Sequence, residues 1–141
     1  MARVTFYDIA PDQVFALAAK LAQAAWDKDK RLIIRCADAH EAKALDDHLW
    51  TFRDESFVPH EVFGGALRDP RARIVITTRD ERPIEADILL QLAPAELAFA
   101  TGFDTVIDLV DHADEARLAA SRQRFRAWSE AGTRPDVKSK A

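Results

Sequence analysis

Short apolar runs alternate with longer amphipathic stretches along this chain. Five runs are rich in β-branched, aromatic or leucine residues and are bounded by polar residues or proline, which is typical of strands: 4–7, 31–36, 73–78, 87–92 and 106–110. Between these runs, apolar residues recur three and four positions apart. This spacing predicts helices that begin near Pro11, Asp38, Pro94 and Asp114. The last helix should end near Glu130, before Gly132 and Pro135.

Alternation of strands and helices predicts the fold class. Uninterrupted apolar strands such as Leu32-Ile33-Ile34 are typical of sheets that are covered on both faces. We therefore expect a three-layer α/β fold with a mainly parallel central sheet. A loop-rich stretch at 53–71, which contains Gly64-Gly65, leaves the strand order open. Residues 1–132 should form a single domain and residues 133–141 a polar, disordered tail.

Composition restricts the possible environment and partners. The chain has 141 residues, of which 48% are hydrophobic and 31% charged, as in a globular domain. No apolar run approaches the roughly 20 residues that span a bilayer, and Asp8 interrupts the start before a signal-peptide core could form. The lone Cys36 fits a reducing cytoplasm. With a net charge of −4, direct binding to DNA would need a local basic patch.

The chain lacks the glycines that phosphate sites require. In such folds the first strand leads into a glycine-rich turn whose backbone N–H groups approach the phosphate. Here the first strand leads into Asp8-Ile9-Ala10-Pro11, and the whole chain has four glycines. Neither a Walker motif nor a dinucleotide fingerprint can be assembled. We therefore expect no phosphate-binding loop and no cofactor.

No catalytic group stands out among the reactive side chains. His40 and His48 lie eight positions apart on one predicted helix, too far for one metal ion without other ligands. Cys36 lies in an apolar strand, which favours a packing role. The Asp46-Asp47 pair reads as solvated surface, because neighbours in a helix point about 100° apart. We expect a protein without catalytic or metal-binding residues.

The segment 45–60 contains large apolar residues that the helix core does not need. Trp50 lies at the edge of the apolar stripe, and Phe57, Val58 and Pro59 follow four polar residues in a predicted loop, ahead of His60. Such residues either fold under the loop as a small second core or form a docking surface. In the docking interpretation, Trp50 and Phe57 are rigid anchors.

The last predicted helix has two contrasting arcs. At about 100° per residue, alanines and Gln123 share one arc, whereas Leu118, Phe125 and Trp128 share the opposite arc. A small alanine face suits close packing on the sheet. The larger face would then form an apolar strip between arginines, suited to a peptide that has an apolar end and carboxylates. The alternatives are that Phe125 and Trp128 are core, or that the helix binds nucleic acid through basic and aromatic residues.

Several motifs together resemble the chi subunit family of the DNA polymerase III holoenzyme. They are VTFY in the first strand, LDDHLW followed by ESFVPH, DILLQL, FDTVIDLV, and RQRFRAW followed by Ala131-Gly132. Their order covers about residues 3 to 132. The specific part is the pair formed by the LD-x-x-LW and SFVPH motifs.

The resemblance implies a Rossmann-like fold and a non-catalytic adaptor function in the cytoplasm. It implies that the chain links the clamp-loader assembly to single-stranded-DNA-binding protein, by holding that protein's acidic C-terminal tail, which ends in phenylalanine. By motif match, the tail would contact Val110, Arg122 and Phe125, with Leu118 beside them. Arg117 matches loosely, and Arg124 and Arg126 could substitute for it.

The resemblance also implies a second partner, a psi subunit or a helicase. It would dock on Trp50, Phe57, Val58, Pro59 and His60. DNA would be reached only indirectly, and no membrane would be involved. Two other functions stay open: a small α/β enzyme, which a deep polar pocket at the carboxyl ends of the strands would favour, and a direct binder of single-stranded nucleic acid.

Overall fold

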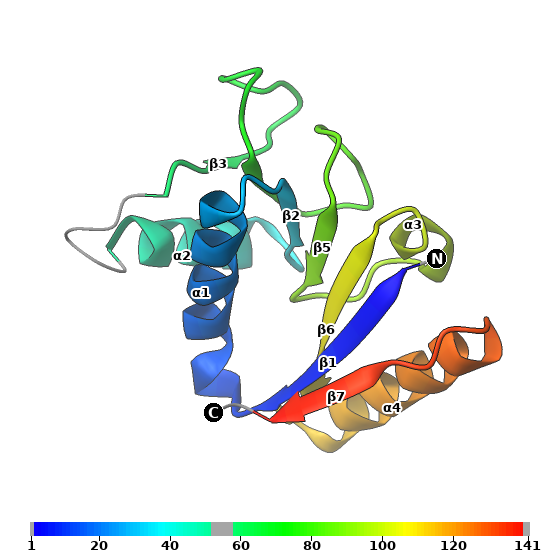
Figure 1. The fold of residues 1–141 in the computed structure, drawn as a ribbon. Helices are drawn as coiled ribbons and strands as arrows, with labels where there is room; N and C mark the ends of the chain where they lie inside the picture. The colour runs from blue at the N-terminus through cyan, green and yellow to red at the C-terminus, as the bar shows by residue number, and fades with distance from the viewer. Residues whose placement is uncertain (1, 52–57, 140–141) are drawn as a thin grey trace.

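One parallel sheet runs through the protein (Figure 1). The structure, a computed structural model, describes residues 2–51 and 58–139. Seven strands pair in the order β3-β4-β2-β5-β6-β1-β7, and every neighbouring pair is parallel. The strands are β1 (Arg3–Ile9), β2 (Leu32–Arg35), β3 (Glu61–Val62), β4 (Ile74–Thr77), β5 (Ile88–Gln91), β6 (Thr105–Asp111) and β7 (Asp136–Ser139). This arrangement confirms the predicted α/β class with a parallel central sheet.

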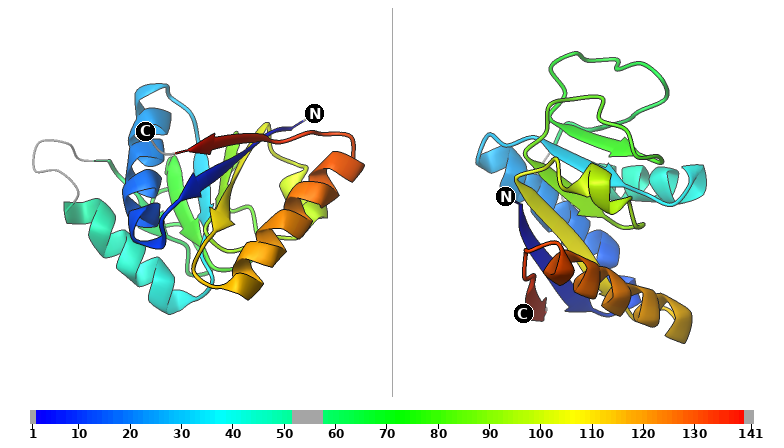
Figure 2. Two further views of the ribbon diagram at one scale, coloured as in Figure 1. Left: turned by 90° about the horizontal axis from the view of Figure 1, so that it is seen from below. Right: turned by 90° about the vertical axis from the view of Figure 1, so that its right-hand side faces the viewer.

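Helices cover both faces of the sheet, as expected (Figure 2). On one face lie α1 (Val14–Asp27), which follows the short 3-10 turn η1 (Pro11–Gln13), and α2 (Ala39–Thr51). On the other face lie α3 (Leu97–Ala100) and α4 (Glu115–Glu130). None of the helices in the described residues is long and apolar enough to cross a membrane.

The central strands are buried on both sides. In β2, Leu32 and Ile34 pack toward α1 and α2, whereas Ile33 packs into the opposite core with Val75 and Leu89. Alternate side chains of a strand point to opposite faces, so an unbroken apolar run is needed where both faces are covered. The run Leu32-Ile33-Ile34 is therefore buried on both sides, as the sequence predicts.

Helix ends follow the signals in the sequence. The Asp38 carboxylate accepts a hydrogen bond from the Glu41 N–H at 2.9 Å, and Asp114 accepts one from the Arg117 N–H at 2.8 Å. At the other end of α4, Gly132 adopts a φ of 98°, which a residue with a side chain rarely adopts. The predicted beginnings and end of these helices are confirmed.

The polar tail contains a strand, which corrects the expectation of disorder from residue 133 onward. Residues 136–139 form β7 and pair in parallel with β1, with Val137 opposite Phe6. All four side chains of β7 are exposed, so the strand is held by backbone hydrogen bonding and has no hydrophobic signature. The short β3, inside the stretch predicted to be loop-rich, lacked such a signature as well.

The face of α4 that packs on the sheet is the opposite of the one predicted. Ala116, Ala119 and Gln123 are exposed, whereas Trp128 is 3% exposed and belongs to the core. The Phe125 ring lies against Phe6, with ring centroids 5.5 Å apart. Large aromatic side chains bury far more apolar area than alanines do, so their burial decides the orientation of the helix.

Candidate protein-binding surfaces

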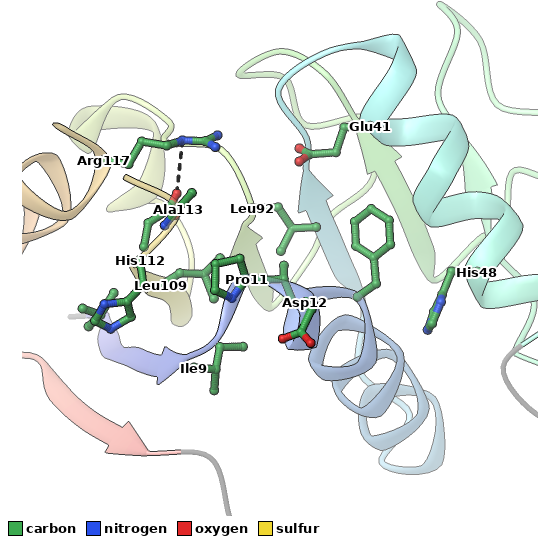
Figure 3. A pocket seen from close by; sticks show the side chains of 14 residues that line it. Ile9, Pro11, Asp12, Glu41, His48, Leu92, Leu109, His112, Ala113 and Arg117 are labelled. Atoms are coloured by element: carbon green, nitrogen blue, oxygen red, sulfur yellow. Dashed lines mark hydrogen bonds and ion pairs between the residues drawn. The ribbon is translucent and has the colours of Figure 1, made fainter. Parts of the chain in front are cut away.

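A pocket lies at the carboxyl ends of the strands, where open α/β sheets usually bind ligands (Figure 3). Its volume is about 380 Å³. The apolar part of its lining comes from the ends of β1, β5 and β6 and from the start of α1: Ile9, Pro11, Val14, Phe15, Leu92, Leu109, Val110 and Ala113. Charged or titratable side chains complete the lining: Asp12, Glu41, His48, Asp111, His112 and Arg117.

The chain's own carboxylates lie at the helix ends around this pocket. The positive amino end of a helix attracts anions and is the usual place for a phosphate. Here Asp38 and Glu41 accept N–H groups at the start of α2, and Asp114 caps α4. Asp12 lies in the first turn of η1. A phosphate would meet these negative charges, so the pocket does not suit a nucleotide.

The reactive groups near the pocket do not assemble into a catalytic set. His112 Nε2 lies 2.5 Å from Asp8 Oδ1, but within the described part of the chain no hydroxyl or thiol hydrogen-bonds to this histidine. Cys36 is fully buried, and burial raises the pKa of its thiol to about 12. Among residues 2–51 and 58–139, no three histidine, cysteine or acidic side chains are placed to hold a metal ion.

The arginines of α4 divide between two sides of the helix. Arg117 lines the pocket, and its Nε lies 3.4 Å from Asp111 Oδ2. Arg124, about two turns further along the same side, binds Asp108 with two of its guanidinium nitrogens, at 2.8 and 3.0 Å. Arg122 and Arg126 are exposed, and in the described residues neither forms an ion pair. Of the predicted substitutes for Arg117, Arg126 is therefore available and Arg124 is engaged.

Asp108 anchors α4 to the sheet. It is 1% exposed, and besides Arg124 it accepts hydrogen bonds from the Gln91 side chain and the Leu109 N–H. Burial raises the pKa of the Asp108 carboxyl, and the hydrogen bonds and charge of Arg124 oppose that rise. The network joins β5, β6 and α4. It therefore sets the position of the helix relative to both flanking strands.

The side of α4 that faces β7 carries the other predicted residues. Leu118, Arg122 and Phe125 follow one another at spacings of four and three positions, so they share this side. Phe125 and Val110 are half-buried against the same core. Beside them, Val137 of β7 is 55% exposed and lies opposite Phe6 in the sheet, so it points to the α4 face.

We call these residues the tail surface: Val110, Leu118, Arg122, Phe125 and Val137. Four of the five predicted residues lie in the tail surface, and Val110 also lines the pocket beside Arg117. Arg117 itself lies about 140° around the helix from Arg122. Val137 was missed, because a single valine among polar residues gives no strand signal. Its position depends on the pairing of β7 with β1.

A second surface surrounds Trp50, at the end of α2. The Trp50 side chain is 50% exposed, and its ring lies over His60 with centroids 4.5 Å apart. His60 is buried. Its Nδ1 lies 2.8 Å from the Val58 carbonyl oxygen and its Nε2 lies 3.0 Å from Asp46 Oδ1. Val58 is buried and Pro59 is half-buried, whereas Phe57 lies outside the described residues.

Burial divides the residues of this segment into two groups. Val58 belongs to the same core as Leu45 and Leu49 of α2, and His60 is buried as well. Trp50 rests on that core and exposes half of its surface. An exposed tryptophan held in place by buried neighbours fits a docking anchor.

Comparison with known proteins gives consistent matches over most of the chain. The family described as "DNA polymerase III chi subunit, HolC" matches residues 1–136. The DNA polymerase III subunit chi of Pseudomonas aeruginosa is 33% identical over 135 residues, with 94% of this chain and 92% of the relative covered. That of Escherichia coli is 33% identical over 139 residues, with 94% of each chain covered.

Among solved structures, T4 UvsW is similar in fold, with a TM-score of 0.70 at 10% sequence identity. The match covers 99% of this chain and 41% of that protein. At this identity the likeness concerns the α/β fold alone. The family match and the two relatives together show that this chain belongs to the DNA polymerase III chi subunit family.

Proposed function

We propose that this protein is a non-catalytic adaptor subunit of the bacterial replicative DNA polymerase. It would act in the cytoplasm and link the clamp-loader assembly to single-stranded-DNA-binding protein by holding that protein's acidic C-terminal tail. The observation that carries the proposal is the tail surface. There, half-buried Phe125 and exposed Val137 lie beside Arg122, which has no ion-pair partner in the described residues.

The sign of the local charge supports this location for the tail. Arg122 and the neighbouring Arg126 can bind carboxylates by charge-assisted hydrogen bonds, while Phe125, Leu118 and Val137 offer apolar contact to a terminal ring. The pocket on the other side of α4 is rich in carboxylates, and Arg117 is engaged there by Asp111. An acidic tail would be repelled from the pocket.

The test is a titration with fluorescent tail peptides that either keep or lack the terminal phenylalanine. We expect loss of the ring to weaken binding at least tenfold, and binding to weaken as salt rises, because exposed charges are screened over about 10 Å at 0.1 M. Arg122→Ala should weaken binding several-fold. Arg117→Ala, on the same helix, is the matched control and should change it little. Equal affinity of the two peptides would refute the proposal.

The surface around Trp50 is proposed to dock a psi subunit or a helicase. Trp50 would supply the exposed anchor, and Pro59 and Phe57 would extend it. Val58 and His60 would act by support, since both are buried. No cofactor is required for either interaction.

Trp50→Ala and Phe57→Ala should each weaken capture of the psi subunit or helicase at least tenfold, because truncating an interface anchor commonly costs 2 kcal/mol or more. Affinity for the tail peptide should stay within twofold. Asp47→Ala, an exposed change on the same helix, is the control. Simultaneous loss of partner and tail binding would show instead that these residues maintain the fold.

A small α/β enzyme remains a second candidate because of the pocket at the carboxyl ends of the strands. Its apolar lining and ring of carboxylates suit an uncharged or cationic ligand more than a phosphate ester. The adaptor function is preferred because its residues are grouped on one surface with complementary chemistry for a peptide.

A further inference from the structure

Basic side chains from two distant segments meet at the amino ends of β2 and β4. The first segment follows α1 and ends at Arg31, and the second precedes β4 and ends at Arg73. Because Leu32 pairs with Ile74 in parallel register, the two segments lie at the same edge of the sheet, at the top of Figure 1. We call this the basic corner; its cations are Lys28, Lys30, Arg31, Arg68, Arg71 and Arg73.

Four of these cations are available for a ligand. Arg73 pairs with Asp29, and Arg71 lies 3.9 Å from Asp69. Lys28, Lys30, Arg31 and Arg68 are exposed, and within the described residues their side chains form no ion pair. Counting the nearby Asp27, Asp29, Glu61, Asp69 and Asp87, the corner carries six positive and five negative charges. Its net charge is +1, in a chain whose net charge is −4.

Hydrogen bonding and ring contact fix the turn after α1 and the Arg73 side chain. The turn after α1 places Asp29 at a φ of 58° and is closed by a 2.8 Å hydrogen bond from the Lys30 N–H to the Ala25 carbonyl. The guanidinium of Arg73 lies 3.8 Å from the centre of the Trp26 ring and covers it. The two lysines and Arg31 are therefore displayed from a fixed turn beside a fixed strand end.

The composition of the corner favours a nucleic acid over a protein. Protein interfaces have an apolar centre and contain few lysines. The large exposed hydrophobic residues in the described part of the chain are Trp50 and Val137, and neither lies in the corner. Exposed cations along an edge match the regular phosphates of a single strand, which need charge and no apolar pocket.

We propose that the basic corner makes direct, weak electrostatic contact with the phosphates of single-stranded DNA. The contact uses Lys28, Lys30, Arg31 and Arg68 and has no base specificity. It is separate from the tail surface, which lies on α4 and β7. In an assembly already held on DNA, a weak contact of this kind gains from a high effective concentration.

The test is fluorescence anisotropy of labelled oligo(dT), 20 nucleotides long, with the purified full chain. Each phosphate contact contributes about −0.7 to the slope of log K against log salt for single strands. Three or four contacts therefore predict a slope of roughly −2 to −3 and a fall in affinity of roughly 100-fold between 20 and 150 mM salt. The double variant Lys30→Glu/Arg31→Glu should lower affinity at 20 mM salt at least tenfold.

The matched control is Arg122→Glu/Arg126→Glu, which makes the same change in total charge on α4. It should lower DNA affinity less than threefold, and circular dichroism should show both variants folded. Equal losses in the two variants would overturn the proposal, because they would reflect total charge alone. Undetectable binding at 20 mM salt would overturn it as well, as would poly-glutamate competing as well as unlabelled oligo(dT).

Discussion

At the scale of single residues, Asp108 shows how one buried carboxylate positions a binding surface. Its two hydrogen bonds with Arg124 hold the middle of α4 on the sheet. Arg122 and Phe125, which flank Arg124 in sequence, project to the other side of the helix. The buried pair of Asp108 and Arg124 therefore fixes the position of the residues that form the tail surface, and it would not contact the ligand itself.

Replacing Arg124 with Met should test this pair. Removing one partner of a buried ion pair leaves the other charge uncompensated, which commonly costs about 3 kcal/mol or more. We therefore expect the free energy of unfolding at pH 7.5 to fall by about that amount. Without Arg124, the pKa of Asp108 rises further, because the interactions that oppose the effect of burial are gone.

A carboxyl whose pKa is raised in the folded state destabilises the fold at a pH above that folded-state pKa. This destabilisation disappears as the pH falls below the pKa that the carboxyl has in the unfolded chain. The difference between Arg124→Met and the wild type should therefore shrink as the pH is lowered from 7.5 toward 4. Urea denaturation at several pH values measures it. Arg126→Met, on the exposed side, should show no change, and a pH-independent loss in Arg124→Met would contradict this account.

At the scale of elements, α4 is oriented by its largest side chains. The sequence shows two arcs that could each face the sheet. Only the folded chain shows that Phe6 of β1 needs the Phe125 ring as a neighbour. A ligand can therefore contact only the half-buried side of α4, because the aromatic residues do not form a fully exposed strip.

Substitutions on the two arcs should differ sharply in their effect on stability. Trp128→Ala should lower the free energy of unfolding by about 3–5 kcal/mol, because it empties a buried aromatic site. Ala119→Glu should change it by less than about 0.5 kcal/mol, since that side chain is exposed. Thermal and urea denaturation compare them. A large loss in Ala119→Glu would show that the alanine face is packed.

At the scale of the whole molecule, β7 completes the sheet and contributes to the tail surface. It covers one edge of β1, yet all its side chains are exposed. Removing it would leave the edge of β1 from Thr5 to Asp8 without a neighbouring strand. Loss of β7 should therefore change both the self-association of the protein and its binding of the acidic tail.

Truncation after residue 133 should leave the chain folded, with increased self-association and weakened tail binding, because the edge of β1 and the contact of Val137 are both affected. Light scattering after gel filtration measures the first, and the labelled peptide measures the second. Val137→Ala in the full chain separates the effects, since it should weaken tail binding and leave the protein monomeric. A truncated protein with unchanged mass and affinity would argue against both functions of β7.

Features that depend on neighbouring residues could be predicted from the amino-acid sequence. The apolar runs predicted five of the seven strands, Asp38 and Asp114 predicted the starts of two helices, and the residues after β1 excluded a glycine-rich phosphate turn. Its motifs also indicated the family that the comparisons show. Each of these features depends on spacing or backbone chemistry within a few positions, which a linear chain displays.

The grouping of distant residues on one surface follows from the folded chain. Folding turned the aromatic face of α4 inward, engaged Arg124 with Asp108, and added β7 to β1 across more than a hundred positions. It also placed Lys30 and Arg31 beside Arg73 at one edge of the sheet. The reason is physical: burial and hydrogen bonding between remote segments depend on sheet order and helix rotation, which local patterns do not specify.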